Sequence, residues 1–344
     1  MKTFPRRIFY LLWLLALLLL TACSSKENSD NHPATGDPGN ILRIDVDCDF
    51  GLFNPHKVGC SGSTLVFPFI FSFLCVQNTA GELEPDLAAA WDYDPKTFTW
   101  RIRLRDDARF HNGEPVTADD ALFSIRSTIE NRDKSLGNII DTMQAINSYA
   151  LEIRLKRDDP SFLKSIWDIE IIPSPARQAS LNPDESPIGS GPFKFVSRTD
   201  DGRVVLSANE NYYNGRPAID RVVLYYIPDR EASWIRLIKG QTDVVGNLTF
   251  KDYKIIEQYT DRFYFSQALY PYYTILLYNT RHPLFETPMV RRALTQAIDR
   301  DYIVQNILNG LAEVIAGPMG NGSIWHDPDL KPLPYDPAHA LELL

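Results

Sequence analysis

The stretch Leu104–Asp120, LRDDARFHNGEPVTADD, decides the fold because a turn signal and a helix start follow one another in it. Apolar and polar residues alternate in Phe98–Leu104 just before it, which predicts a half-buried strand. Asn112-Gly113 is a tight-turn signal. Thr117 can cap a helix and Asp120 can return a hydrogen bond to it. Apolar residues then recur at helical spacing at Ala121, Leu122, Ile125 and Ile129. The stretch therefore predicts a strand, a turn and a capped helix.

Similar patterns predict strands and helices along residues 41–344. Alternating or apolar segments predict strands at Ile44–Phe50, Leu151–Leu155, Phe193–Val196, Val204–Leu206, Val222–Ile227 and Tyr272–Tyr278. Helices are predicted after Pro228-Asp229, from Pro288, up to Gly310, and from Asp336-Pro337. Leu65–Val76 predicts one buried element, and Gly59–Ser63 a loop of small residues. This mixture predicts an α/β or α+β fold with more than one lobe.

The first 22 residues have the three parts of a secretory signal peptide. Basic residues precede Ile8–Leu20, an apolar run of 13 residues that is too short to cross a hydrocarbon core of about 30 Å. Leu20-Thr21-Ala22-Cys23 resembles the bacterial lipobox, which implies that Cys23 is acylated and becomes the first mature residue. The alternative is an ordinary signal peptide or a short signal anchor. We expect residues 1–22 to be a lipoprotein signal peptide.

The composition is that of a folded acidic protein. Hydrophobic residues make up 44% and charged residues 23% of the chain, which is ordinary for a globular protein. Loss of residues 1–22 would remove three basic residues and no acidic one, and would change the net charge from −9 to −12. This charge disfavours nucleic acid and anionic lipid as partners, so acyl chains on Cys23 would provide the membrane attachment. The polar segment 23–40 is predicted to be a flexible tether.

Motifs that carry chemistry are absent from the sequence. The cysteines lack CxxC spacing, the six histidines are scattered and are interpreted as surface or turn residues, and no P-loop occurs. Gly59–Ser63 does not match GxSxG. We therefore expect no enzyme activity, no metal and no cofactor, and ligand capture in a cleft is the better interpretation. Cys48 and Cys60 can form a disulfide, or they and Cys75 can be buried thiols.

A series of sequence blocks follows one another along the chain. They are Gly81–Trp91, Leu104–Asp120, Gly189–Phe193, Asn209–Tyr213, Asn279, Val290–Leu294 and Ala297–Arg300. In this order they resemble the blocks of the family 5 extracellular solute-binding proteins, the peptide/nickel-type binding proteins (cluster C) of ABC importers. Residues such as Gly189 and Gly191 have a structural reason to be there, because glycine permits a backbone path that is closed to other residues. The blocks therefore identify the scaffold and not the ligand contacts.

The resemblance implies a mixed α/β fold of the periplasmic-binding-protein-like type II, with two lobes that close on a ligand by hinge motion and an extra inserted domain. Residues 41–71 and 188–268 would form lobe I, residues 72–187 the inserted domain, and residues 270–344 the start of lobe II. Members of the family are longer than this chain. We therefore expect lobe II to be incomplete and the chain to be a C-terminally truncated reading frame or fragment.

The candidate ligand-binding residues follow from this expected architecture. Loops after the first strand face the cleft in such proteins, so Cys60, Ser61 and Ser63 are candidates, because their small side chains let a ligand backbone approach. Tyr272 and Tyr273 lie near the predicted crossing between the lobes and are candidates for packing against ligand side chains. The alternative for both tyrosines is packing within a strand.

The sequence is interpreted as the substrate-binding component of an ABC importer. We expect a monomeric, extracytoplasmic or periplasmic lipoprotein that captures oligopeptides or similar small solutes through backbone hydrogen bonds. Its partners would be an ABC permease and an ATPase, with the lipid anchor on the membrane. The alternatives are a lipoprotein hydrolase or peptidase, and a truncated receptor that takes no part in transport.

Overall fold

The structure is a computed structural model of the 344-residue chain. It describes residues 40–57, 61–78, 81–175, 185–246, 248, 252, 257–259, 262–264, 273–319, 327 and 329–344. The chain divides into two compact units, residues 1–247 and residues 248–344. The two units are described separately.

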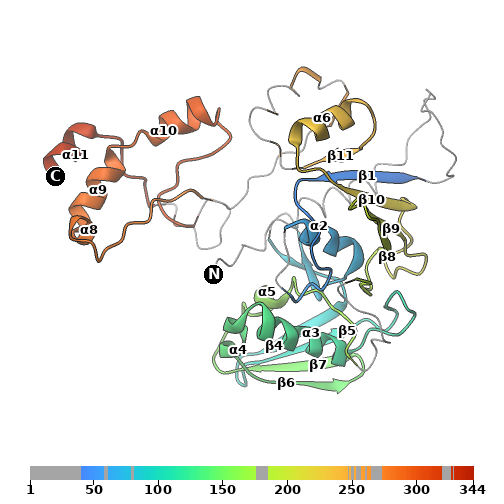
Figure 1. The fold of residues 1–344 in the computed structure, drawn as a ribbon. Coiled ribbons are helices and arrows are strands. Elements are labelled where there is room, and N and C mark those ends of the chain that lie inside the picture. Colours follow the sequence, from blue (N-terminus) through green and yellow to red (C-terminus); the bar gives the residue numbers. More distant parts are fainter. Residues whose placement is uncertain are drawn as a thin grey trace. The chain divides into compact units, whose positions relative to one another are not determined.

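The first unit contains a five-stranded sheet in the order β11-β1-β10-β9-β8. β1 is parallel to β10 and to β11, whereas the pairs β10–β9 and β9–β8 are antiparallel. The sheet therefore joins the start of the described chain to a segment that follows much later in the sequence (Figure 1). Its strands are β1 (Ile41–Val46), β8 (Phe193–Arg198), β9 (Val204–Ala208), β10 (Arg221–Tyr226) and β11 (Val244–Val245).

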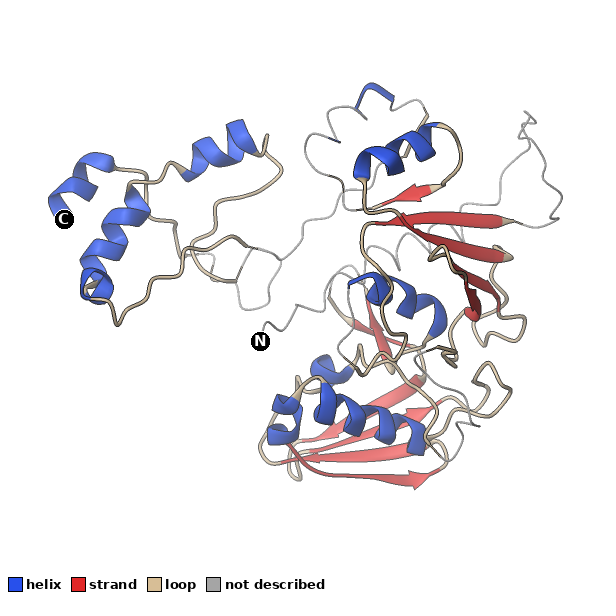
Figure 2. Ribbon diagram, viewed as in Figure 1, coloured by secondary structure: helices blue, strands red, loops and turns tan. Residues whose placement is uncertain are grey.

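One helix packs on each face of this sheet. Helix α2 (Ser61–Ile70) contributes Phe67 and other apolar side chains to a buried cluster that includes Ile44 of β1. Side chains of adjacent strand residues point to opposite faces, so Asp45 lies on the other face of β1. There it bonds with Arg236 of helix α6 (Arg230–Ile238). Both helices flank the sheet in Figure 2.

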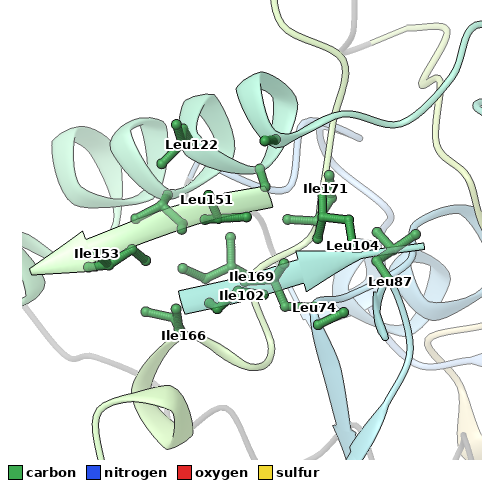
Figure 3. Close-up of a cluster of buried hydrophobic side chains, with 14 of the residues drawn as sticks. Leu74, Leu87, Ile102, Leu104, Leu122, Leu151, Ile153, Ile166, Ile169 and Ile171 are labelled. Carbon is green, nitrogen blue, oxygen red and sulfur yellow. The ribbon is translucent and has the colours of Figure 1, made fainter. Parts of the chain in front are cut away.

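A second, four-stranded antiparallel sheet follows the order β4-β5-β7-β6. Its strands are β4 (Ala88–Asp94), β5 (Thr99–Leu104), β6 (Ile140–Asn147) and β7 (Ala150–Leu155). Helices α3 (Ala118–Asn131), α4 (Lys134–Ile139) and α5 (Leu163–Ile166) accompany it, and β2 (Cys75–Gln77) pairs with β3 (Leu83–Pro85). The apolar face of α3 packs against this sheet, with Leu122 next to Leu151 (Figure 3).

The start of α3 confirms the prediction from the sequence. Thr117 donates from its backbone N–H at 2.9 Å and from Oγ1 at 2.6 Å to Asp120 Oδ2. The second carboxylate oxygen of Asp120 accepts from the backbone N–H of Ser174 at 2.9 Å. Gly113 has a φ of 91°, and its N–H donates to the carbonyl of Phe110, which closes the predicted turn. The signature stretch thus forms the expected turn and capped helix.

The second unit is helical in its described residues. It contains η2 (Glu257–Tyr259), α8 (Pro283–Glu286), α9 (Pro288–Gln296), α10 (Arg300–Tyr302), a π-helical turn η3 (Ile303–Ile307) and α11 (Pro337–Leu343). Ala293 of α9 and Ala340 of α11 are buried, and the N–H of Asp336 donates to the carbonyl of Gln296 at 2.9 Å. The helices predicted from Pro288 and from Asp336-Pro337 are confirmed.

Three expectations about local structure are wrong. Residues 273–278 form no strand, and Ile275, Leu276 and Leu277 are exposed. A strand needs a neighbour for its backbone hydrogen bonds, and none lies beside this segment among the described residues of the second unit. Ser61–Ser63 is not a loop but the first turn of α2. Leu65–Val76 is two elements, since α2 ends at Ile70 and β2 begins at Cys75.

Candidate functional site

The carboxyl ends of three parallel strands meet at one edge of the five-stranded sheet. β1 ends at Val46, β10 at Tyr226 and β11 at Val245. In open α/β sheets, ligands bind outside the carboxyl ends of the strands, where the segments that leave these ends supply polar groups. We call segments 47–57, 227–230 and 246 the carboxyl edge. The carboxyl edge is the candidate ligand site of the first unit.

Exposed ion pairs lie at the carboxyl edge. Arg230 Nη2 is 3.8 Å from Asp47 Oδ2. Arg198, at the end of β8, donates from Nη2 to Asp49 Oδ1 at 2.8 Å and from Nη1 to the carbonyl of Gly51 at 3.0 Å. An exposed pair contributes about 0–1 kcal/mol, so these side chains can change partners at low cost. The carboxyl edge can therefore present both a carboxylate and a guanidinium group to a polar ligand.

A buried ion pair fixes α6 behind the carboxyl edge. Arg236 donates from Nε to Asp45 Oδ2 at 2.9 Å, and the Asp45 side chain is fully buried. The guanidinium carbon of Arg236 lies 4.5 Å from the centre of the Tyr225 ring. Asp229 accepts from the backbone N–H of Glu231 at 2.9 Å and so caps the helix. The cap holds the first turn of α6 at the carboxyl edge, and the contacts of Arg236 hold the last turn against the sheet.

The structure describes two of the three candidate residues with small side chains, Ser61 and Ser63. Cys60 lies outside the described residues. Ser61 and Ser63 belong to the first turn of α2, which follows the segment that leaves β1. The backbone N–H groups of a first helical turn have no partner within the helix and can bind polar groups. A contact of Ser61 or Ser63 with ligand remains a prediction.

The two candidate tyrosines belong to the second unit. Tyr272 lies outside the described residues, and Tyr273 is 46% exposed. Tyr273 lies in a segment without regular secondary structure and not in the strand expected for it. An exposed aromatic ring can pack against a ligand side chain. This role too remains a prediction.

Asp86 connects the two sheets of the first unit through buried hydrogen bonds. It precedes β4, and its Oδ2 accepts from the backbone N–H of Phe73 at 3.0 Å. Its Oδ1 accepts from the hydroxyl of Tyr213, in the loop between β9 and β10, at 2.5 Å. Burial raises the pKa of Asp86 to about 6, although these two hydrogen bonds and the charge of Arg105 oppose the shift.

His111 makes a second connection between the sheets. Its Nε2 donates to the carbonyl of Gly191 at 3.1 Å, and its Nδ1 accepts from the backbone N–H of Gly189 at 3.4 Å. The acceptor at Gly191 assigns the proton to Nε2 of a neutral ring. Burial is the main cause that lowers the pKa of His111 to about 4. We call Asp86, Tyr213, His111, Gly189 and Gly191 the inter-sheet junction.

The sequence interpretation missed the roles of two histidines. His111 is half-buried and bonded through both ring nitrogens, and His56 is 1% exposed and bonded from Nε2 to the carbonyl of Glu170 at 2.8 Å. Both residues lie in turns, as expected, but neither side chain is exposed at the surface. Their partners lie far away along the chain, so no local pattern identifies them.

The described part of the chain contains no group of three or more histidine, cysteine, aspartate or glutamate side chains arranged to hold a metal ion. None of its helices combines the length and the apolar character that spanning a membrane requires. Residues 1–39, which include Cys23 and the predicted signal peptide, lie outside the described residues.

The comparison with protein families gives one match over most of the chain. The family described as "Bacterial extracellular solute-binding proteins, family 5 Middle" matches residues 82–344. Among curated proteins, the oligopeptide-binding protein AppA of Bacillus subtilis is 28% identical over 347 aligned positions, which cover 95% of this chain and 63% of AppA. The nickel-binding periplasmic protein of Escherichia coli is 27% identical and covers 86% of this chain, with 58% of its own length matched.

Solved structures agree on the fold. NikZ from Campylobacter jejuni in complex with Ni(L-His) has a TM-score of 0.77 at 26% identity, over 89% of this chain and 63% of NikZ. AppA from Bacillus subtilis in complex with a nonapeptide has a TM-score of 0.71 at 24% identity, over 89% of this chain and 64% of AppA. The expected type II binding-protein fold is therefore confirmed.

The chain spans about three fifths of the length of these curated relatives, 63% of AppA and 58% of the nickel-binding protein. The relatives are named as binding proteins and not as enzymes. Three observations indicate the same family. They are the sequence blocks, the mixed α/β fold and the match over residues 82–344. The chain belongs to the family 5 bacterial extracellular solute-binding proteins.

Proposed function

We propose that this chain is the substrate-binding component of an ABC importer, and that its natural ligands are oligopeptides or similar small solutes. The observation that carries the proposal is the family match over residues 82–344, together with the 28% identity to an oligopeptide-binding protein. The nickel-binding and haem-binding relatives make metal complexes and haem the competing ligand classes.

The proposed site places the ligand at the carboxyl edge of the first unit. Its exposed pairs, Asp47 with Arg230 and Asp49 with Arg198, can rearrange around the charged ends of a peptide. Backbone groups of the first turn of α2, near Ser61 and Ser63, would hydrogen bond the ligand backbone. Tyr272 and Tyr273 would pack against it from the second lobe. Cys60 would line the same site.

The proposed organisation follows the family. Residues 41–71 and 188–268 would form lobe I, residues 72–187 the inserted domain and residues 270–344 the beginning of lobe II. The two sheets support this division, because the five-stranded sheet draws its strands from residues 41–46 and 193–245 and the four-stranded sheet from residues 88–155. A ligand would bind between the lobes and be released to a permease coupled to an ATPase.

We further propose that residues 1–22 are removed and that Cys23 carries the lipid that anchors a monomer outside the cytoplasm. Metabolic labelling with radioactive palmitate tests this directly. Label is expected in the membrane fraction with the wild-type chain and absent with Cys23→Ser. Label that persists in Cys23→Ser, or a full-length chain in the cytosol, would contradict the anchor.

Ligand binding is tested on the mature chain without its lipidated Cys23, residues 24–344, which is the form called the mature chain in the experiments below. Isothermal titration calorimetry is carried out against a tetrapeptide mixture, nickel with L-histidine, and haem. Binding of the peptides alone is expected, and preference for either competitor would reject the oligopeptide assignment. A double variant, Asp47→Asn with Arg230→Gln, is expected to weaken peptide binding. The matched double variant Asp141→Asn with Arg154→Gln removes an exposed pair from the four-stranded sheet and should leave binding unchanged.

A hydrolase is the alternative that the same material can test. The peptide mixture is incubated with the mature chain and analysed by mass spectrometry. Intact peptides are expected. Cleavage that disappears in Ser61→Ala would replace the proposed binding function with an enzymatic one.

A further inference from the structure

Residues 170–174, which we call the support segment, run along helix α3. The backbone N–H of Ser174 donates to Asp120 Oδ1 at 2.9 Å, and that of Ile172 donates to Ser124 Oγ at 3.0 Å. Asp120 and Ser124 are fully buried and, four positions apart, share one face of α3. Because the later residue of the support segment bonds the earlier residue of the helix, the segment runs antiparallel to α3.

The first residue of the support segment meets the end of α3 and the carboxyl edge at one point. Arg132, the residue after α3, donates from Nη1 to Glu170 Oε2 at 2.9 Å and to the carbonyl of Pro55 at 2.8 Å. The buried ring of His56 donates from Nε2 to the carbonyl of Glu170 at 2.8 Å. Pro55 and His56 belong to the carboxyl edge. Helix α3 and the support segment therefore hold the carboxyl edge through two adjacent residues.

The support segment also holds the chain on the other side of α2. The backbone N–H of Ile171 donates to the carbonyl of Ser72 at 3.0 Å. Ser72 comes shortly after the end of α2, and His56 comes shortly before its start. The support segment is thus bonded to the chain both before and after the helix whose first turn belongs to the proposed ligand site.

The two sides of the carboxyl edge are held with different strength. On one side, Arg198 bonds Asp49 through an exposed ion pair, and such pairs contribute little to stability. On the other side, Arg132 bonds Pro55 and the Glu170 side chain, which is only 3% exposed. Removal of one partner from a buried pair is costly. The carboxyl edge therefore has one adaptable side and one firmly held side.

We propose that Arg132 and Glu170 are positioning residues for ligand binding, which hold the carboxyl edge in the conformation that accepts the ligand without contacting the ligand themselves. Segment 47–57 contains no helix or strand. A segment that is ordered before the ligand arrives avoids the loss of conformational freedom that ordering on binding would cost. The inference rests on the proposed ligand site at the carboxyl edge, and it gives the four-stranded sheet and its helices a role in affinity.

Isothermal titration calorimetry compares the wild-type mature chain with Arg132→Met and with the double variant Arg132→Met, Glu170→Gln. The double variant lacks the uncompensated buried carboxylate, so it separates loss of the bond to Pro55 from loss of stability. Arg101→Met with Glu152→Gln is the matched control, because it makes the same two substitutions in an exposed pair on the four-stranded sheet. The ligand is the peptide mixture, or nickel with L-histidine or haem if the wild-type chain binds one of these instead.

Both variants of Arg132 are expected to bind the ligand roughly 3- to 30-fold more weakly than the wild-type chain, and the control should bind it equally well. A purely structural role predicts that stability and affinity recover together in the double variant, whereas positioning predicts that only stability recovers. Wild-type affinity in the double variant would overturn the inference and leave the proposed function intact. A wild-type chain that binds none of the three ligands would reject the proposed function, and the inference with it.

Hydrogen exchange locates the effect at the carboxyl edge. The N–H of His56 donates to Asn54 Oδ1 at 3.1 Å, and that of Lys57 donates to the carbonyl of Asn54 at 3.2 Å. Peptides containing residues 54–57 should exchange faster in the double variant than in the wild-type chain, and unchanged exchange there would overturn the inference. If neither variant folds, the wild-type chain decides. Protection at residues 54–57 as high as at the end of α3 is then expected, and free exchange would overturn the inference.

Discussion

Gly189 lies directly against the backbone of Ile70, at the end of α2. A Cβ atom on Gly189 would be 1.9 Å from the carbonyl oxygen and 2.6 Å from the carbonyl carbon of Ile70, and the N–H of Gly191 donates to the same oxygen at 2.8 Å. This contact joins α2, which packs on the five-stranded sheet, to the segment that leads into β8. This contact explains why glycine occupies positions 189 and 191 of the Gly-Ser-Gly-Pro block, since any side chain there would clash with the backbone of Ile70.

We predict that Gly189→Ala destabilises the first unit strongly. The obstructing atoms belong to backbone, so the segment must move, and a loss of about 3 kcal/mol or more in the free energy of unfolding is expected. Gly246→Ala is the control, because nothing lies within 4 Å of a Cβ atom there. Urea unfolding followed by circular dichroism measures both. Equal stability of the two variants would contradict the contact.

A second prediction concerns the buried pair of Arg132 and Glu170. Arg132 Nη1 donates to Glu170 Oε2 at 2.9 Å and to the carbonyl of Pro55 at 2.8 Å, and the Glu170 side chain is 3% exposed. Arg132→Met leaves a buried carboxylate without its cation, which costs roughly 3–5 kcal/mol. The double variant Arg132→Met with Glu170→Gln should recover most of this loss.

The matched control for Arg132 is Arg101→Met. Arg101 pairs with Glu152 at 3.1 Å on the exposed face of the four-stranded sheet. An exposed pair contributes about 0–1 kcal/mol, so unfolding of Arg101→Met should lie close to wild type. If Arg132→Met lowers the free energy of unfolding by no more than Arg101→Met does, the buried pair is no more stabilising than the exposed one.

The accuracy of the sequence interpretation depended on how local each signal was. The start of α3 was predictable because Thr117 and Asp120 are three positions apart and bond each other. The strand expected at 272–278 is not formed in its described part, 273–278, because a strand depends on a neighbour that the alternating pattern cannot reveal. The fold class could be predicted from blocks such as Gly189–Phe193. The glycines of this block are required because two backbone segments pack closely there.

The contacts of the inter-sheet junction and of the carboxyl edge could not be predicted from the sequence, because their partners are far apart along the chain. Asp86 and Tyr213 are separated by 127 positions, and His111 and Gly191 by 80. The sequence near Asp86 or His111 contains no pattern that identifies the partner of that residue. Asp45 and Arg236 are 191 positions apart, and the parallel pairing of β1 with β10 and β11 brings them together behind the carboxyl edge. Topology, and not spacing, assembles the carboxyl edge.

We predict that the thiol of Cys75 is unreactive in the native chain. Burial raises its pKa to about 12, with a smaller contribution from the charge of Asp86, so almost no thiolate exists at pH 8. In the mature chain with Cys48→Ser and Cys60→Ser, Ellman's reagent should label no thiol until denaturant is added. Asp86→Asn should leave the thiol protected, because burial is the larger cause. Rapid native labelling would contradict the buried position of Cys75.

The last prediction concerns Arg236, which joins α6 to the sheet at the carboxyl edge. Its Nε bonds Asp45 at 2.9 Å, its Nη2 bonds the carbonyl of Gln241 at 3.4 Å, and its guanidinium stacks on Tyr225. Arg236→Lys keeps the charge but loses the planar stacking and the second hydrogen bond, so an intermediate loss of stability is expected. Arg236→Met leaves the buried Asp45 carboxylate uncompensated and should cost roughly 3–5 kcal/mol.

The control for Arg236 is Arg43→Met, on the same strand as Asp45. Arg43 and Asp243 form an exposed pair at 3.5 Å, so its loss should change the free energy of unfolding by no more than about 1 kcal/mol. Hydrogen exchange locates the effect, because only Arg236→Met should increase exchange across α6. Since α6 begins at the carboxyl edge, the same variant should weaken binding of the peptide mixture more than Arg43→Met does. Unchanged exchange in α6 would mean that the helix is held to the sheet by other contacts.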